Sequence, residues 1–296
     1  GSIQNYHTKG INVTIINRST TLLTLVIATI VLLSANSVKA GSAVFVGQRT
    51  AASVSVEKLD HSVWNKLLSR YIDKDGYVNY SSWHTSSTDR KALAGYLNSL
   101  STASITTSSS EDARLAFWIN AYNAVTVYGI LREYPTTSIR NHTARVFGYN
   151  IWHDLQLYVA GKAYSLDTIE HQILRKMSEP RIHFAIVCAS IGCPRLLNEA
   201  YTPSRVKSQL ETNAKDFFAR SQNFRHDISG QRFYLSSIMS WFADDFGSSQ
   251  TAQLRTISSW LPTKTAQLAA TSGGTRVTYL DYNWDLNDQK SRPTTR

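Results

Sequence analysis

Cys188 and Cys193 are the only cysteines in the 296-residue chain, and they lie five positions apart. A cysteine thiolate is a strong nucleophile, and a nearby histidine can lower the pKa of its thiol toward neutral pH. His183 is the histidine nearest to them in the sequence. These residue types predict thiol chemistry, namely hydrolysis or acyl transfer at an amide or ester, with one cysteine as nucleophile and His183 as base.

Further polar residues could complete such a site. Glu170 could orient His183 or His171, and the amides of Asn120 and Asn123 could donate hydrogen bonds to an oxyanion. This set resembles that of a papain-like thiol hydrolase or transferase, although no local signature of such a family surrounds either cysteine. A simpler interpretation of the two asparagines, which we prefer, is that they bind neighbouring backbone.

A disulfide between Cys188 and Cys193 is the main alternative to a nucleophilic thiol. An even number of cysteines in an exported protein favours a bridge, and the short spacing allows one across a turn. A bridge that closes so short a loop would stabilise the folded state by about 3 kcal/mol or less. The pair could also be a reversible redox couple, although its spacing differs from that of C-x-x-C sites. A structural bridge, a redox pair and a free nucleophile therefore remain open.

Two other chemistries fit the same segment less well. Cys188-Ala-Ser-Ile-Gly192 partly matches the elbow that presents a nucleophilic serine, here Ser190, but it lacks the first glycine of that motif. A zinc site could be formed by His171, His183 and the two cysteines, but their spacing in the sequence is not typical of zinc ligands. We therefore expect no metal and no cofactor.

Residues 181–188 form an apolar run that predicts a buried strand, with the loop 190–194 at its end. In a regular strand His183 and Cys188 would point to opposite faces. Pairing of these two side chains therefore requires the strand to end before Cys188, whereas Cys193 in the loop has no such restriction.

Two helices are predicted to position the polar candidates. Residues 111–133 have a serine cap, two acids in the first turn and Pro135 beyond the end, and residues 115–131 are apolar nearly all round, which is typical of a central buried helix. Residues 166–177, capped by Ser165, carry Glu170 within their apolar stripe. A carboxylate that faces a core needs a partner, and Arg181 and His183 are the nearest candidates.

The other segments predict a mixed fold. Alternation over 153–164, interrupted by Ala160-Gly161-Lys162, indicates a hairpin. Further helices are expected at 58–71, 203–220, 236–246 and 250–261, and short strands at 232–235 and 276–279. We predict an α+β fold: a helix-rich single domain around a small sheet, compatible with a papain-like or transglutaminase-like arrangement.

The first forty residues are predicted to be a signal for export. An uncharged apolar run at 22–33 follows Arg18 and precedes Val38 and Ala40, which suit a signal-peptidase site, and the run is shorter than a spanning helix needs. Gly1 and Ser2 resemble a cloning remnant. We expect a flexible lead-in over 41–57, a single domain over 58–290, and an exported protein, periplasmic or secreted, with no stable membrane span after cleavage.

Charge and composition limit the choice of partner. Lys and Arg number 31 against 21 Asp and Glu, a formal net charge of +10, but the cations form no runs of the kind that bind nucleic acid. Seven Trp and 15 Tyr suit a surface that binds carbohydrate or peptide, although such counts more often reflect core packing. A small molecule, a peptide or a glycan is the expected substrate, and nucleic acid is not.

Several motifs together resemble one family. They are Phe117-Trp-Ile-Asn-Ala-Tyr-Asn123, Ile169-Glu-His171, Pro180-Arg-Ile-His-Phe-Ala185, Cys188-Ala-Ser-Ile-Gly-Cys-Pro194, Leu235-Ser-Ser-Ile238, Trp241-Phe-Ala-Asp-Asp-Phe246 and Asp281-Tyr-Asn-Trp-Asp-Leu-Asn287. In this order, over about residues 71–287, the chain resembles an exported bacterial member of the domain-of-unknown-function 547 family. The resemblance implies no established general activity.

Two hypotheses of different classes follow. The first is a thiol-centred enzyme, which predicts a solvent-reachable thiol that lines a pocket with His183. The second is a non-catalytic binding or envelope-associated module, in which Asn120, Asn123, Glu170, Arg181 and His183 hold the fold together. It predicts a bridged or buried cysteine pair and an exposed apolar groove.

Overall fold

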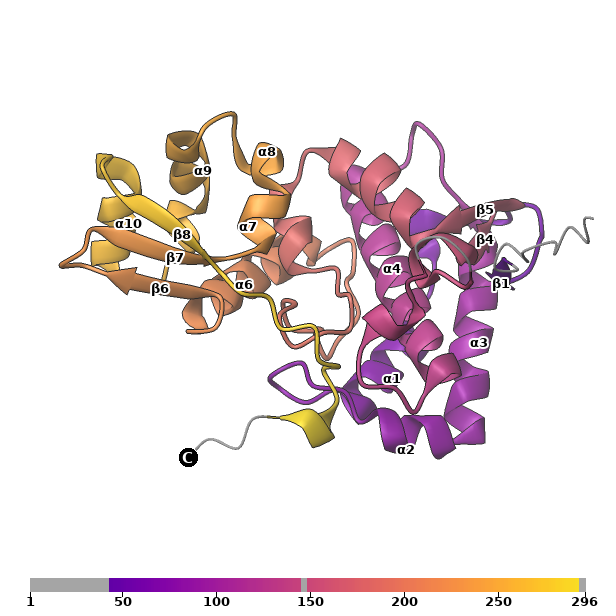
Figure 1. Cartoon of the computed structure of the whole chain (residues 1–296). Helices are drawn as coiled ribbons and strands as arrows, with labels where there is room; N and C mark the ends of the chain where they lie inside the picture. Colours follow the sequence, from indigo (N-terminus) through magenta and orange to yellow (C-terminus); the bar gives the residue numbers. More distant parts are fainter. Residues whose placement is uncertain (1–42, 145–147, 293–296) are drawn as a thin grey trace, which may run out of the picture. The chain divides into compact units, whose positions relative to one another are not determined.

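The long helix α4 (Glu111–Glu133) is the central element of the fold (Figure 1). Its first turn is capped by Ser110, whose Oγ accepts a hydrogen bond from the backbone N–H of Ala113 at 3.2 Å. Tyr134 follows in extended conformation, directly before Pro135, and the helix ends there. Almost every residue between Leu115 and Leu131 is buried, so the predicted central helix is confirmed.

The computed structural model describes residues 43–144 and 148–292, so the predicted signal at 1–40 lies outside the described residues. The elements near α4 are α1 (Ser62–Tyr71), α2 (Tyr80–Thr85), α3 (Ser87–Ser101), α5 (Ile151–Asp154), η1 (Val56–Lys58) and η2 (Ile139–His142). A three-stranded sheet in the order β1-β4-β5 packs with them, built from β1 (Val44–Val46), β4 (Leu155–Val159) and β5 (Lys162–Ser165). The antiparallel pairing of β4 and β5 confirms the predicted hairpin.

A second hydrophobic core forms around a second three-stranded sheet. This sheet, in the order β6-β7-β8, consists of β6 (Phe224–Asp227), β7 (Arg232–Ser236) and β8 (Arg276–Leu280). The helices near it are α6 (Val206–Ala219), α7 (Ile238–Trp241), α8 (Ala243–Phe246), α9 (Gln250–Ile257), η6 (Ser258–Trp260) and α10 (Lys264–Ser272). Phe184, Phe217 and Phe233 lie fully buried at its centre.

The described residues therefore form an α+β fold, as predicted. The strands divide into three small sheets, because β2 (Val54–Ser55) and β3 (Ala103–Ser104) pair separately in parallel. The short η7 (Gln289–Ser291) follows the last strand. Within the described ranges no helix has both the length and the apolar character needed to cross a membrane.

The predicted strand at 181–188 is wrong. Residues Pro180–Phe184 form the 3-10 helix η5, and an irregular segment leads from it to Cys188. Pro180 occupies the first turn, and the Glu179 carboxylate accepts a hydrogen bond from the backbone N–H of Arg181, so the local sequence favours a helical start. An apolar run alone does not distinguish a buried strand from a buried helical turn. The strand alternation that would separate His183 from Cys188 therefore does not apply.

The predicted helix at 166–177 is present in an unusual form. Ser165 caps it, and residues Thr168–Leu174 form the π-helix η3, which continues into the 3-10 helix η4 (Arg175–Met177). A π-helix is rare in proteins and is often found at functional sites. This winding sets the direction of Glu170 and His171.

The stretch 43–57 differs from the flexible lead-in that we expected. Val44–Val46 pairs in parallel with β4, and Val46 and Val56 are buried in the core around α4. Burial of these valines and the backbone pairing attach the segment to the domain. The composition of the stretch does not reveal this, because its pairing partner β4 lies about a hundred residues further along the chain.

Candidate functional site

A cavity of about 290 Å³ brings together all four residues predicted to be catalytic. Glu170, His183, Cys188 and Cys193 line it, together with His171. Aromatic side chains form most of the remaining wall: Tyr122, Trp152, Trp241, Phe242, Tyr282 and Trp284. The cavity is thus an apolar hollow with a few convergent polar groups, which is the usual character of a small-molecule site.

Cys188 and Cys193 are joined by a disulfide, and their Cα atoms are 6.3 Å apart. The structure therefore contains the disulfide that we gave as the main alternative to a free, nucleophilic thiol. Cys188 is half-buried, whereas Cys193 is 8% exposed. A reagent that enters the cavity would meet Cys188 more readily than its partner.

Hydrogen-bond donors surround both sulfur atoms. The Tyr282 hydroxyl lies 3.0 Å from Cys188 Sγ and 3.1 Å from Cys193 Sγ, and the backbone N–H of Cys188 donates to Cys193 Sγ at 2.9 Å. Ser190 Oγ lies 2.9 Å from the Tyr282 hydroxyl and 3.4 Å from Cys193 Sγ. Burial raises the pKa of Tyr282 above its ordinary value, so this hydroxyl stays protonated and can donate. These donors would stabilise negative charge on Cys193 after reduction.

His183 is held by a carboxylate that the sequence analysis did not select. Its Nε2 lies 2.7 Å from Asp245 Oδ2, and its ring stacks on Phe242 with centroids 4.1 Å apart. Burial lowers the pKa of His183 to about 4, against the opposing effect of Asp245. His183 is therefore neutral at pH 7. If Nε2–H donates to Asp245, Nδ1 carries the lone pair of a base.

Asp245 also binds Arg175. The guanidinium donates to both carboxylate oxygens, from Nε at 2.6 Å and from Nη2 at 2.8 Å. Burial raises the pKa of Asp245, but the hydrogen bonds from Arg175 and His183 outweigh it and hold the pKa below its usual value. The carboxylate thus stays ionised and fixes the imidazole, the role of the third member in a nucleophile–base site.

The partner of Glu170 is Tyr122, so the expected pairing with Arg181 or His183 is wrong. The Tyr122 hydroxyl donates to Glu170 Oε2 at 3.0 Å. Burial raises the pKa of Glu170, and the neighbouring His171 opposes the rise. Arg181 instead pairs with Glu179 and Glu211 and does not line the cavity. The reason is the 3-10 turn of η5, which replaces the predicted strand and places His183, but not Arg181, toward the cavity.

His171 lies between two charged groups at the cavity. Its Nδ1 is 3.1 Å from Arg175 Nη1, and its Nε2 is 3.7 Å from Asp167 Oδ1. It is therefore linked to His183 through Arg175 and Asp245. This network replaces the direct contact between Glu170 and a histidine that we expected.

Asn120 and Asn123 bind backbone, as in the interpretation that we preferred. Asn120 donates to the Tyr201 carbonyl at 2.8 Å and accepts from the Tyr201 N–H at 3.0 Å. Asn123 donates to the Ala185 carbonyl at 2.9 Å and accepts from the Val187 N–H at 3.0 Å. Neither lines the cavity. Asn123 therefore positions the segment between η5 and Cys188, and its amide is not free for an oxyanion.

We expect Asn123→Ala to lower the free energy of unfolding by about 3 kcal/mol, because two buried backbone groups lose their partners. Urea denaturation followed by tryptophan fluorescence measures this loss. Asn98→Ala is the matched control, since Asn98 is half-buried on α3 and should lose about 0.5 kcal/mol or less. Similar losses in both variants would contradict the positioning role of Asn123.

The backbone beside Cys188 is strained. Ala189 has a φ of 57°, in the left-handed region that side chains other than glycine rarely adopt, and it is buried. The backbone N–H of Asn287 donates to its carbonyl at 3.1 Å. Strain of this kind is concentrated at functional sites and persists only where the surroundings enforce it. Among the described residues, no group of three or more His, Cys, Asp or Glu is arranged to hold a metal ion.

The fold and the cavity define an α+β domain with a disulfide, a carboxylate-bound histidine and an aromatic wall at one site. Residues 106–218 match the family described as protein of unknown function DUF547, so the predicted resemblance to this family is confirmed over that part of the chain. The match includes Glu170, His183 and both cysteines, but it ends before Asp245 and Tyr282. No curated protein and no solved structure matches the chain.

Proposed function

We propose that this domain is a cysteine-dependent enzyme that hydrolyses an amide or ester, or transfers its acyl group, when the Cys188–Cys193 bridge is reduced. The observation that carries the proposal is that Cys188 and His183 line the same cavity, while Asp245 binds His183 at 2.7 Å. A nucleophile, a base and a carboxylate that orients the base are the parts that acyl transfer requires. The strained Ala189 beside the nucleophile supports the assignment.

Cys188 is the nucleophile in this proposal, because it is the less buried of the two cysteines. His183 takes the thiol proton as the sulfur attacks the carbonyl carbon. The C–N or C–O bond of the substrate then breaks, and the leaving group departs with the proton from His183. Water, or the amine or hydroxyl of an acceptor, attacks the thioester and restores the thiol.

The cavity wall indicates the kind of acyl donor. Trp241 and Trp284 stack with ring centroids 5.7 Å apart, and Trp241 is 49% exposed. Aromatic faces of this kind pack against peptide side chains and sugar rings. A peptide or a glycan that carries the amide or ester is therefore the proposed substrate class.

The same observations support a second candidate, a binding module in which the bridge is structural. The bridged cysteines and the largely aromatic cavity are the features that this hypothesis predicts. A third candidate, thiol–disulfide exchange, is supported by the donors around Cys193 Sγ, because they would stabilise this sulfur as the leaving group. We also propose export, which is supported by the predicted signal and by the disulfide.

Thiol reactivity separates these candidates. The native protein is treated with a mild reductant at pH 7, alkylated, and mapped by peptide to identify the labelled cysteine. We expect the reductant to free both thiols and the alkylating reagent to label Cys188 faster than the more buried Cys193, and we expect the labelling of Cys188 to be at least about tenfold slower in His183→Gln. A bridge that resists the reductant until the protein is denatured would overturn the enzyme and leave the binding module. Reduction of the bridge in the native protein, with Cys188 labelled equally fast in His183→Gln, would favour thiol–disulfide exchange.

A further inference from the structure

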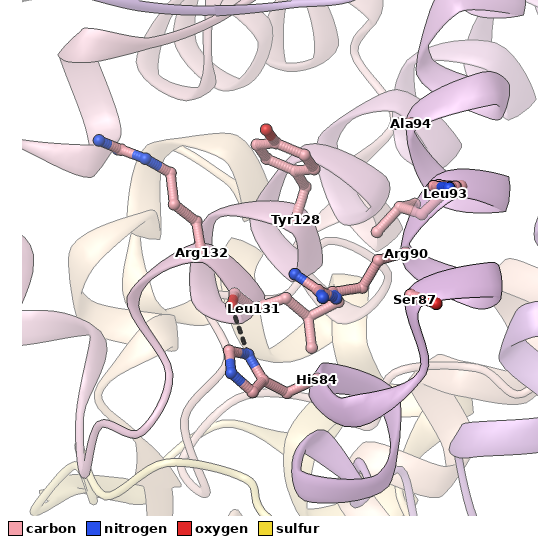
Figure 2. Close-up of a pocket in the computed structure, with 9 residues that line it drawn as sticks. His84, Ser87, Arg90, Leu93, Ala94, Tyr128, Leu131 and Arg132 are labelled. Carbon is pink, nitrogen blue, oxygen red and sulfur yellow. Dashed lines mark hydrogen bonds between the residues drawn. The ribbon is translucent and has the colours of Figure 1, made fainter.

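A second cavity, of about 450 Å³, lies between α3 and α4 and shares no lining residue with the cysteine cavity. Ser87, Arg90, Lys91 and Ala94 line it from α3, and their spacing places them on one helix face. Tyr128, Leu131 and Arg132 line it from α4, and His84 lines it from α2. Figure 2 labels the lining residues other than Lys91 and shows the His84 ring bonded to the Leu131 carbonyl, at 3.0 Å.

The cavity lining is rich in positive charge. Arg90, Lys91 and Arg132 contribute three cations, and no Asp or Glu lines the hollow. Within residues 43–144 and 148–292, Arg90 and Lys91 have no ion-pair partner. Arg132 pairs with the adjacent Glu133 at 3.0 Å, and its guanidinium lies over the Tyr149 ring, 4.9 Å from the centroid. Arg90 and Lys91 therefore present two positive charges at the hollow that no carboxylate of the described residues neutralises, and an anion bound beside them would be attracted by both.

The volume of the cavity and the apolar part of its lining limit the kinds of ligand that it could bind. The volume suits a small organic molecule and exceeds what a single inorganic ion needs. Leu93 and Leu131 are buried side chains at the floor. Arg90 and Arg132 carry guanidinium groups, which bind phosphate and carboxylate with paired hydrogen bonds.

We propose that this cavity binds a small organic anion, a phosphate or carboxylate attached to an apolar group. The charged end lies among Arg90, Lys91 and Arg132, and the apolar end lies against Leu93 and Leu131. This site is independent of the proposed enzyme activity, because it shares no residue with the cysteine cavity.

Titration calorimetry of the whole protein with phenyl phosphate, inorganic phosphate and benzoate tests the proposal. We expect phenyl phosphate to bind, and its affinity to fall at least about tenfold in Arg90→Gln/Lys91→Gln. The control is Lys66→Gln/Arg255→Gln, which removes the same charge from exposed positions outside the cavity. Circular dichroism and thermal unfolding confirm that both variants fold. Equal weakening in both variants, or no binding of any probe by the native protein, would overturn the proposal.

Flotation with vesicles determines where the anion comes from. Binding to vesicles that contain phosphatidylglycerol, lost in Arg90→Gln/Lys91→Gln and kept in the control, would assign the site to a lipid headgroup. Binding of phenyl phosphate without vesicle binding would assign it to a free metabolite. Vesicle binding that is equally strong in both variants would argue against this cavity.

Discussion

Replacing Cys188 by serine is expected to abolish acylation of the reduced protein by an activated ester such as p-nitrophenyl acetate. The loss should be at least about a thousandfold, because the variant lacks the sulfur that accepts the acyl group. Stopped-flow detection of p-nitrophenolate measures the rate, and mass spectrometry of the quenched protein locates the acyl group.

Cys193→Ser is the matched control for this experiment, since it makes the same atomic change and also removes the bridge. Its Cys188 thiol is free, so the variant should be acylated without any reductant. His183→Gln should keep the thiol but slow its acylation by about 10² to 10⁴. Acylation of Cys188→Ser at the rate of Cys193→Ser would show that Cys188 is not the nucleophile.

Acid is expected to destabilise this protein steeply between pH 6.5 and 4 through two buried histidines. Burial lowers the pKa of both His61 and His183 to about 4, whereas each returns to about 6.5 on unfolding. The unfolded chain therefore binds these protons first as the pH falls. Each histidine contributes about 3 kcal/mol of stability, which is fully present above pH 6.5 and lost as the pH approaches 4.

Urea denaturation at a series of pH values measures this dependence. With both histidines present, the free energy of unfolding should fall by about 2.7 kcal/mol per pH unit near pH 5. His61→Gln should halve that slope, since glutamine takes up no proton. The raised pKa of Glu170 acts in the opposite direction, because its contribution is lost as the pH rises. A slope that His61→Gln leaves unchanged would show that this histidine is protonated in the folded state.

Local signals explain which parts of the fold the sequence predicts. The cap at Ser110 and the stop at Pro135 predict both ends of α4, and the Ala160-Gly161 turn predicts the β4–β5 hairpin. Each of these signals lies within a few residues of the element that it ends or joins. The prediction of a strand at 181–188 is wrong because the first of these residues belong to a short, buried 3-10 helix. A run that is apolar almost throughout shows no helical spacing of its apolar residues, so the sequence pattern does not distinguish the two structures.

The candidate site was predictable in its residue types and only partly in its contacts. One cavity is lined by Glu170, His183, Cys188 and Cys193. These residues were predicted from the sequence because thiol chemistry requires a nucleophile, a base and a group that orients the base. Asp245 and Tyr282 were missed as partners. They lie 62 positions from His183 and 89 from Cys193, and tertiary packing alone brings them there. The two aspartates in the Trp241–Phe246 motif were the only signal that pointed to Asp245.

The segment after β8 covers the two cysteines but is synthesised after them. Its residues Asn283 and Asp285 accept hydrogen bonds from the backbone of Gly192 and Ile191, and Tyr282 contacts both sulfurs. A ribosome adds about 5 to 20 residues per second, so Tyr282 leaves the exit tunnel roughly 5 to 20 s after Cys193. Both cysteines thus meet the surrounding redox environment while the wall that will cover them is still being made.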